Sequence, residues 1–172
     1  MGWAIKLTTG IAFFATLNGC VQNRYLGRNP DAGVTAANYT ENYIGYFYIS
    51  STSPGKNNRF AGMAVKEFSK GGTSGGVCCF SSARPGEDIG VEWDTGQRRD
   101  PESSWVRHYA VTRAIGSTSD KPDSNVSLII RFFPDELVEA EYVVQDQSPE
   151  SVRNPRFDEL FKGRRVMRNM GE

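Results

Sequence analysis

Short runs of aromatic and β-branched residues, separated by glycine and proline, follow one another along most of this chain. The clearest run covers residues 43–49 and reads Tyr-Ile-Gly-Tyr-Phe-Tyr-Ile. Such side chains suit a pleated, half-buried surface, and the 18 glycines and 8 prolines between the runs are typical of turns. The pattern predicts a mainly β fold, an antiparallel sandwich or barrel-like domain of about seven short strands.

The remaining runs are spaced closely enough to be joined by short turns. Pro85-Gly86 predicts a tight turn, and Pro134-Asp135 predicts a hairpin. Hydrophobic residues make up 38% of the chain, which is enough for a single core. We expect the further strands at residues 60–65, 77–80, 89–93, 105–112, 126–133 and 137–144.

The start of the chain has a different character. Lys6 precedes an apolar stretch at residues 11–15, and Leu17-Asn18-Gly19-Cys20 follows. A positive start and a short apolar core are typical of a secretory signal, and the stretch is too short to span a bilayer. With its cysteine directly after a glycine, the segment resembles a bacterial lipoprotein signal, although a residue smaller than asparagine is usual before that glycine. The alternative is a buried amphipathic first helix with an ordinary cysteine, which would carry more polar residues.

This resemblance implies that the signal is removed and that Cys20 is acylated, which tethers the protein to a membrane that it does not cross. Val21 stands where an aspartate would favour inner-membrane retention in enteric-type bacteria, so we expect an outer-membrane anchor facing the periplasm. The polar residues after the cysteine are expected to form a linker. The expected organisation is a signal peptide at 1–19, a tether at 20–37, a β-rich domain at 38–145 and a C-terminal extension with a short helix at 146–172.

The formal net charge argues against one large class of function. The chain has 20 Lys and Arg residues and 20 Asp and Glu residues, so its net charge is zero. A nucleic-acid binder needs a basic face that releases counterions from phosphates. We therefore expect a protein partner and no nucleic acid.

The C-terminal extension contains the one helix that the sequence predicts. Asn154 is a suitable N-cap, and Pro155 suits the first helical position. Arg164, Arg165 and Arg168 make the end of this segment basic. Arginines suit the negative end of a helix packed on the sheet, and the alternative is a basic tail that touches anionic lipid headgroups.

Cys78 and Cys79 are the first candidates for chemistry, because Cys20 would be acylated. The main interpretation is two small apolar side chains in or beside the core, since free cysteine is often buried. A vicinal disulfide is the alternative, although neighbouring Cα atoms lie only about 3.8 Å apart, below the usual range for that bond. No further soft ligand stands at a zinc spacing, so we expect no metal and no cofactor.

His108 is the only histidine and could form part of a catalytic pair. Asp94 or Asp100 would then orient its ring, and a serine would be the nucleophile. His108 lies within an expected strand. A histidine that only donates and accepts hydrogen bonds is the simpler interpretation. The sequence therefore predicts a protein that is not an enzyme.

Two polar features suit contact with a partner. The loop at residues 71–76 is rich in glycine but lacks the ending of a phosphate-binding loop, so we interpret it as a mobile connection or a partner-contacting loop. Asp135, Glu136, Glu139 and Glu141 form an acidic stripe around the expected hairpin. A solvated edge protected by charge is the main interpretation, and carboxylates presented to a basic pocket on a partner are the functional alternative.

Four groups of short motifs occur in a fixed order after the signal. They are Asn38-Tyr39-Thr40 before Tyr43-Ile44-Gly45, the glycine run before Val77-Cys78-Cys79, Arg84-Pro85-Gly86 before Val91-x-Trp93, and Phe132-Phe133-Pro134-Asp135. Together they resemble a bacterial family of lipoproteins of unknown function. Members of such families are often encoded beside type VI secretion phospholipase effectors, and some resemble immunity proteins against a phospholipase D-type toxin. The extension after Val144 lies outside this resemblance.

The resemblance implies a membrane-anchored periplasmic immunity protein that binds and inhibits such an effector. A tether would concentrate the inhibitor where the toxin acts. Carboxylates such as Asp135 and Glu136 would take the place of a phosphate among the histidines and lysines of the toxin's site. The alternative is an envelope structural or assembly lipoprotein that binds another outer-membrane component. A periplasmic hydrolase is a third possibility, and no catalytic constellation supports it.

Overall fold

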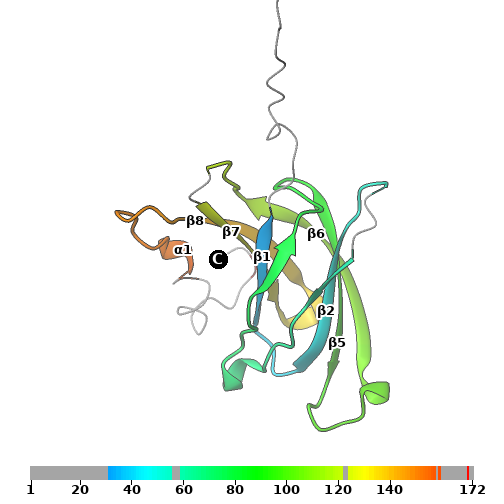
Figure 1. The fold of residues 1–172 in the computed structure, drawn as a ribbon. Coiled ribbons are helices and arrows are strands. Elements are labelled where there is room, and N and C mark those ends of the chain that lie inside the picture. The colour runs from blue at the N-terminus through cyan, green and yellow to red at the C-terminus, as the bar shows by residue number, and fades with distance from the viewer. Residues whose placement is uncertain (1–30, 56–58, 122–123, 158, 160–169, 171–172) are drawn as a thin grey trace, which may run out of the picture.

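Eight strands form one mixed sheet that curls into a nearly closed barrel, with one short helix near the C-terminus (Figure 1). The computed structural model describes residues 31–55, 59–121, 124–157, 159 and 170. The prediction of a mainly β, barrel-like domain is confirmed. The elements are β1 (Ala32–Asn38), β2 (Tyr43–Ser51), β3 (Arg59–Gly62), η1 (Phe68–Lys70), β4 (Val77–Phe80), β5 (Asp88–Gly96), η2 (Glu102–Ser104), β6 (Val106–Gly116), β7 (Ser124–Phe132), η3 (Pro134–Glu136), β8 (Val138–Asp146) and α1 (Pro155–Phe157), where η marks a 3₁₀ helix.

The order of the strands in the sheet is β3-β2-β5-β6-β8-β7-β1-β4. Most neighbours are antiparallel, but β1 runs parallel to β7 and β6 runs parallel to β8. The prediction of a purely antiparallel arrangement is therefore wrong for these two pairs. Parallel neighbours need long connections, and here the whole chain from β2 to β6 lies between β1 and β7.

The first strand lies where the sequence predicts a linker. Strand β1 pairs with β7 on one side and with β4 on the other, so the linker prediction is wrong from Ala32 onward. Ala32, Val34 and Ala36 are almost fully buried in the core. A strand made of small residues carries only a weak β signal in sequence. Residues 20–30 of the expected tether, Cys20 included, lie outside the described residues.

Large side chains fill the interior of the barrel. Phe132, the last residue of β7, packs inside the barrel with ring-centre distances of 5.6 Å to Phe47 and 5.4 Å to Trp93. Phe80 and Tyr142 are also fully buried in the same cluster. Small barrels are normally filled in this way. Their surfaces and ends are therefore the places to look for a binding site.

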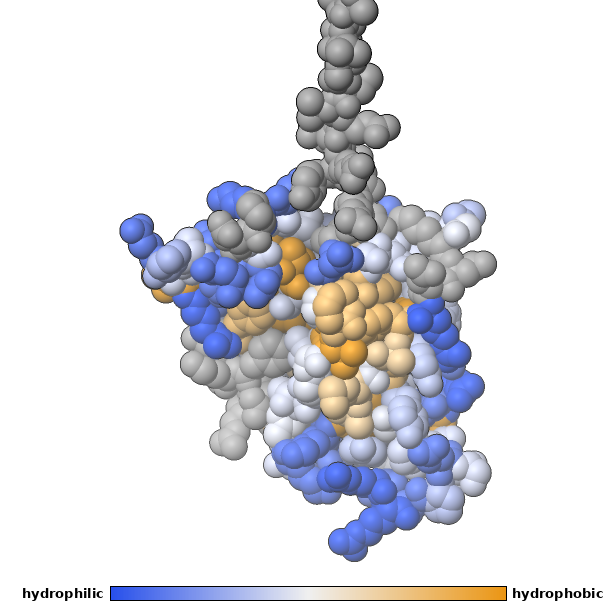
Figure 2. All heavy atoms as spheres, in the orientation of Figure 1, coloured by the Kyte–Doolittle hydropathy of each residue, from blue (hydrophilic) through white to orange (hydrophobic). Residues whose placement is uncertain are grey.

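The barrel is not closed by hydrogen bonds, because β3 and β4 end the sheet. The rings of Phe60 and Phe80 meet across this opening at 6.2 Å. Figure 2 shows apolar side chains gathered in the middle of the visible face, where β4 lies in Figure 1. Polar side chains gather at the lower end of that face (Figure 2).

The C-terminal extension packs on the outer face of β7 and β8. Helix α1 begins where the sequence predicts, and the Asn154 side chain accepts a hydrogen bond from the backbone N–H of Arg156 at 2.9 Å. Phe157 packs against Ile129 and Val143. The basic residues at 164, 165 and 168 lie outside the described residues. No helix in the described part of the chain combines the length and the apolarity needed to cross a membrane.

Candidate functional site at the β7–β8 turn

The turn between β7 and β8 holds two adjacent carboxylates in an unusual backbone conformation. Asp135 has a φ of 61° and Glu136 has a φ of 60°. Few residues other than glycine adopt this left-handed region, which costs about 1–3 kcal/mol each. Both residues are exposed. The expected hairpin is therefore present, and its tip projects two carboxylates into solvent.

His108 on β6 attaches this turn to β5 and β6. Its Nδ1 lies 2.9 Å from Oε1 of Glu136, and its Nε2 lies 2.7 Å from Oγ1 of Thr95 on β5. The imidazole stacks on Trp93 with a ring-centre distance of 5.2 Å. Its side chain is only 14% exposed. The Glu136 carboxylate is thus held by a partly buried ring at the end of the barrel.

A pocket of about 410 Å³ opens beside the turn. Trp93, Phe132 and Phe133 supply its aromatic surface, and Glu41 joins the two carboxylates of the turn at its edge. The described lining residues include no lysine or arginine. Carboxylates next to low-dielectric aromatic walls create a local negative potential. This end of the barrel can therefore attract a cationic group even though the whole chain has no net charge.

The side chain of Asn38 holds Thr40 and Asn42, which line this pocket, in place. The side chain is fully buried, and its Oδ1 accepts hydrogen bonds from the backbone N–H and the hydroxyl of Thr40 at 2.9 and 2.8 Å. Its Nδ2 donates to the carbonyl of Asn42 at 2.7 Å. Tyr39 stacks on Phe133 with ring centres 4.9 Å apart. The Asn-Tyr-Thr motif noted in the sequence therefore shapes the loop that faces the acidic turn.

The carboxylate partner of His108 is not one that the sequence indicates. Asp94 instead accepts a hydrogen bond from Nε of Arg107 at 2.9 Å, and Asp100 is exposed in the turn before η2. The pairing of His108 with either aspartate is therefore wrong. Glu136 was missed as its partner because 28 positions separate the two residues along the chain.

The hydrogen-bonded groups beside the turn have the order found in a hydrolase triad, in which an imidazole joins a hydroxyl to a carboxylate. Here these groups belong to Thr95, His108 and Glu136. Thr95, however, lies in a regular strand and pairs in register with Val106 of β6. A nucleophile normally sits on a sharp, exposed turn. We therefore assign this chain of hydrogen bonds to holding Glu136 in place.

Two of the four predicted interface carboxylates are not available to a partner. Glu139 and Glu141 are only 7% and 8% exposed. Both form ion pairs with the fully buried Arg131. Glu141 also accepts two hydrogen bonds from Arg156, at 2.8 and 2.9 Å, and this contact raises the pKa of the Arg156 guanidinium. The prediction of a solvated stripe is wrong for these two residues, because Arg131 pairs with both and Arg156 of the C-terminal extension also binds Glu141.

The remaining candidates lie away from the turn. Cys78 and Cys79 are exposed on β4 and are joined as a vicinal disulfide, so the interpretation as buried thiols is wrong. In the glycine-rich loop, Gly72 accepts a hydrogen bond from the backbone N–H of Asn38 at 2.8 Å, and Ser74 donates to the carbonyl of Ala36 at 3.0 Å. These bonds attach the loop to β1.

The described residues contain no group of three or more His, Cys, Asp or Glu side chains placed to hold a metal ion.

No family model, curated protein or solved structure matches this chain.

Proposed function

We propose that this protein is a membrane-anchored periplasmic immunity protein that binds and inhibits a phospholipase D-type effector of type VI secretion. Asp135 and Glu136 form its contact with the toxin. The observation that supports this proposal is the presence of two exposed carboxylates on one turn, with one of them held by His108. Anionic groups in such a position suit a site that has evolved to bind a phosphate with histidines and lysines.

The direction in which β1 runs supports the proposal that the β7–β8 turn contacts the toxin. Gly33 pairs with Ser127, and Asn38 pairs with Phe132, so the acidic turn lies at the end of the barrel opposite to the start of β1. The seven residues of β1 span about 20 Å at about 3.3 Å per residue. A lipid anchor at Cys20 would therefore hold the barrel from the start of β1 and present the carboxylates at the other end.

Electrostatic complementarity between the acidic turn and the toxin would mainly affect the rate at which the two proteins associate. A negative turn and pocket facing a basic cleft raise the rate of encounter and select the correct partner. His108 keeps one carboxylate in place, which lowers the cost of ordering it on binding. The proposal therefore assigns binding to Asp135 and Glu136 and positioning to His108.

Co-expression tests this function directly. The full chain with its own signal is produced beside a periplasm-directed phospholipase D-type effector, and growth and complex formation are measured. Asp135→Lys with Glu136→Lys should abolish protection and weaken binding at least tenfold. Glu150→Lys, a reversal at another exposed carboxylate, is the matched control and should protect like the native protein. Full protection by the double variant would reject the turn as the contact.

The anchor is tested separately. Cys20→Ser should abolish labelling by an alkyne fatty acid while leaving the affinity for the effector unchanged. Protection of cells should fall, because the inhibitor is no longer concentrated at the membrane. Unchanged fatty-acid labelling of this variant would contradict acylation at Cys20.

A further inference from the structure

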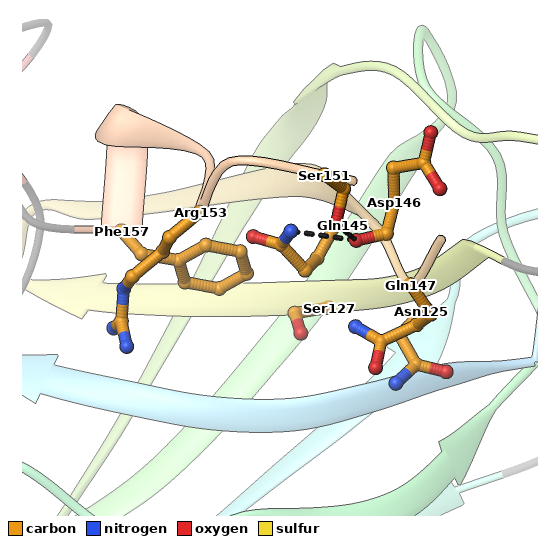
Figure 3. Close-up of a pocket in the computed structure, with 8 residues that line it drawn as sticks. All are labelled: Asn125, Ser127, Gln145, Asp146, Gln147, Ser151, Arg153 and Phe157. Atoms are coloured by element: carbon orange, nitrogen blue, oxygen red, sulfur yellow. Dashed lines mark hydrogen bonds between the residues drawn. The ribbon is translucent and has the colours of Figure 1, made fainter. Parts of the chain in front are cut away.

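We propose that a second pocket, on the outer face of β7 and β8, binds a neutral ligand rich in hydroxyl groups, namely one or two rings of an oligosaccharide. The pocket has a volume of about 480 Å³, within the range of small-molecule sites. This inference does not depend on the proposed inhibition of an effector. The residues that line the pocket are Asn125, Ser127, Gln145, Asp146, Gln147, Ser151, Arg153 and Phe157 (Figure 3).

The floor of this pocket is held in place by hydrogen bonds. Oε1 of Gln145 accepts from the backbone N–H of Asn154 at 2.7 Å, and its Nε2 donates to the carbonyl of Asp146 at 2.7 Å. The hydroxyl of Ser151 donates to the same carbonyl at 2.6 Å (Figure 3). Nδ2 of Asn154 donates to the carbonyl of Val144 at 2.8 Å. A site built in this way loses little conformational freedom when a ligand binds.

Other polar side chains in the pocket are not used by the fold. Asn125 and Gln147 lie side by side at one end, and Ser127 lies between them and Phe157 (Figure 3). Their side chains form no hydrogen bond to any other described residue. Each carboxamide offers two donors and an acceptor, and the serine hydroxyl offers both. Sugar hydroxyls also donate and accept, so this set of groups can be satisfied by one sugar ring.

The opposite end of the pocket supplies an aromatic surface. Phe157 comes from α1 and packs against Ile129 and Val143, and the guanidinium of Arg153 lies over its ring at 5.7 Å from the ring centre. Its ring lies beside the polar groups (Figure 3). An aromatic face provides apolar contact area with little loss of side-chain freedom. The C–H face of a sugar ring can lie on this surface while its hydroxyls reach the carboxamides.

The charges of the lining favour a neutral ligand. Among the described residues of the lining, Asp146 and Arg153 are the only charged ones, and they have opposite signs. The Asp146 carboxylate accepts a hydrogen bond from the backbone N–H of Ser148 at 2.9 Å and points away from the other side chains (Figure 3). A phosphate site would need a clear excess of donors and positive charge. The pocket therefore suits hydroxyl groups better than anions.

Nuclear magnetic resonance of the ¹⁵N-labelled full-length protein in detergent micelles tests the inference. Chitotriose and maltotriose are titrated in parallel, as an N-acetylated and a plain trisaccharide, and inorganic phosphate serves as the anionic probe. One trisaccharide should shift the side-chain amide signals of Asn125 and Gln147 in a saturable manner. A stronger response to phosphate, or no response to either sugar, would overturn the proposal.

Variants locate the binding. Asn125→Ala with Gln147→Ala should raise the dissociation constant of the responding sugar at least tenfold, and Phe157→Ala should do the same. Gln97→Ala removes an exposed carboxamide from a different part of the surface and should change nothing. The double variant changes only side chains that form no hydrogen bond with the described residues, so its fold is expected to persist. Equal affinity in the double variant and in Gln97→Ala would place the sugar elsewhere.

Discussion

His108 on β6 and Glu136 in the β7–β8 turn are joined by a hydrogen bond of 2.9 Å between Nδ1 and Oε1. An ionised carboxylate only accepts hydrogen bonds, so Nδ1 of His108 carries the proton. In the neutral ring, Nε2 is then an acceptor for the hydroxyl of Thr95 at 2.7 Å. This relationship sets both the position of the acidic turn and the tautomer of the histidine.

Neutral His108 is therefore expected in the Nδ1–H tautomer, which ring ¹⁵N chemical shifts report. Glu136→Ala removes the acceptor and should move the ring toward the Nε2–H tautomer, with the Thr95 hydroxyl as the new acceptor. Because Glu136 is exposed, stability should change by only about 0.5 kcal/mol. Asp135→Asn alters the neighbouring carboxylate and should leave the tautomer unchanged. An Nε2–H tautomer in the native protein would contradict the hydrogen bond.

Gly45 is expected to tolerate no side chain. A Cβ atom there would lie 1.6 Å from the ring of Trp105, which covers this glycine. Gly45→Ala should destabilise the fold by about 1–3 kcal/mol in urea unfolding, because the ring must move. Gly33→Ala is the control, since its nearest contact would be an ordinary 3.9 Å. Adding Trp105→Ala should cancel most of the cost of Gly45→Ala, and an additive double variant would reject the clash.

Arg131 is expected to be the most sensitive charged residue of the fold. It is fully buried, and Glu139 and Glu141 both face it. Arg131→Met leaves buried carboxylates without this cation, which should cost about 3–5 kcal/mol in urea unfolding at neutral pH. Arg113→Met removes an exposed ion pair with Asp88 and should cost about 0–1 kcal/mol. Similar losses in the two variants would mean that the buried pair is unimportant.

Glu67 is expected to contribute to the acid sensitivity of the protein. A hydrogen bond from Lys70 at 2.8 Å lowers the pKa of its buried carboxyl below the ordinary value of 4.5. The stabilisation is therefore complete above that value and is lost as the pH falls through the lowered pKa of the folded state. Glu67→Gln should reduce the urea midpoint at neutral pH and converge with the native protein in acid. The exposed Glu150→Gln should follow the native protein throughout, and a constant gap for Glu67→Gln would contradict the linkage.

Local sequence was informative where strands carry large β-branched or aromatic side chains. The expected strand at 77–80 coincides with β4, and those at 43–49 and 89–93 lie inside β2 and β5. The run at 43–49 was recognisable because aromatic and β-branched residues suit a strand. Strand β1 was missed because its residues are small, and the expected strand at 60–65 is shortened to Arg59–Gly62.

The charged residues around β7 and β8 show what alternation cannot predict. Glu139 and Glu141 point out of the barrel as their alternation with Ala140 and Tyr142 indicates, yet they are buried. Arg131 pairs with both glutamates on this outer face, and Arg156 and Phe157, from a segment beyond the barrel, pack on the same face and reach Glu141. A sequence pattern reports which face a side chain takes, and it does not report whether another segment covers that face.

The order of short apolar runs and turns determined by itself that this protein is mainly β, because side-chain alternation and turn residues act over only a few positions. The tertiary structure alone decided the parallel position of β1, the burial of Arg131 and the pairing of His108 with Glu136. Each of these depends on contacts between residues far apart in the chain. Such contacts follow from the closing of the barrel and the packing of its extension.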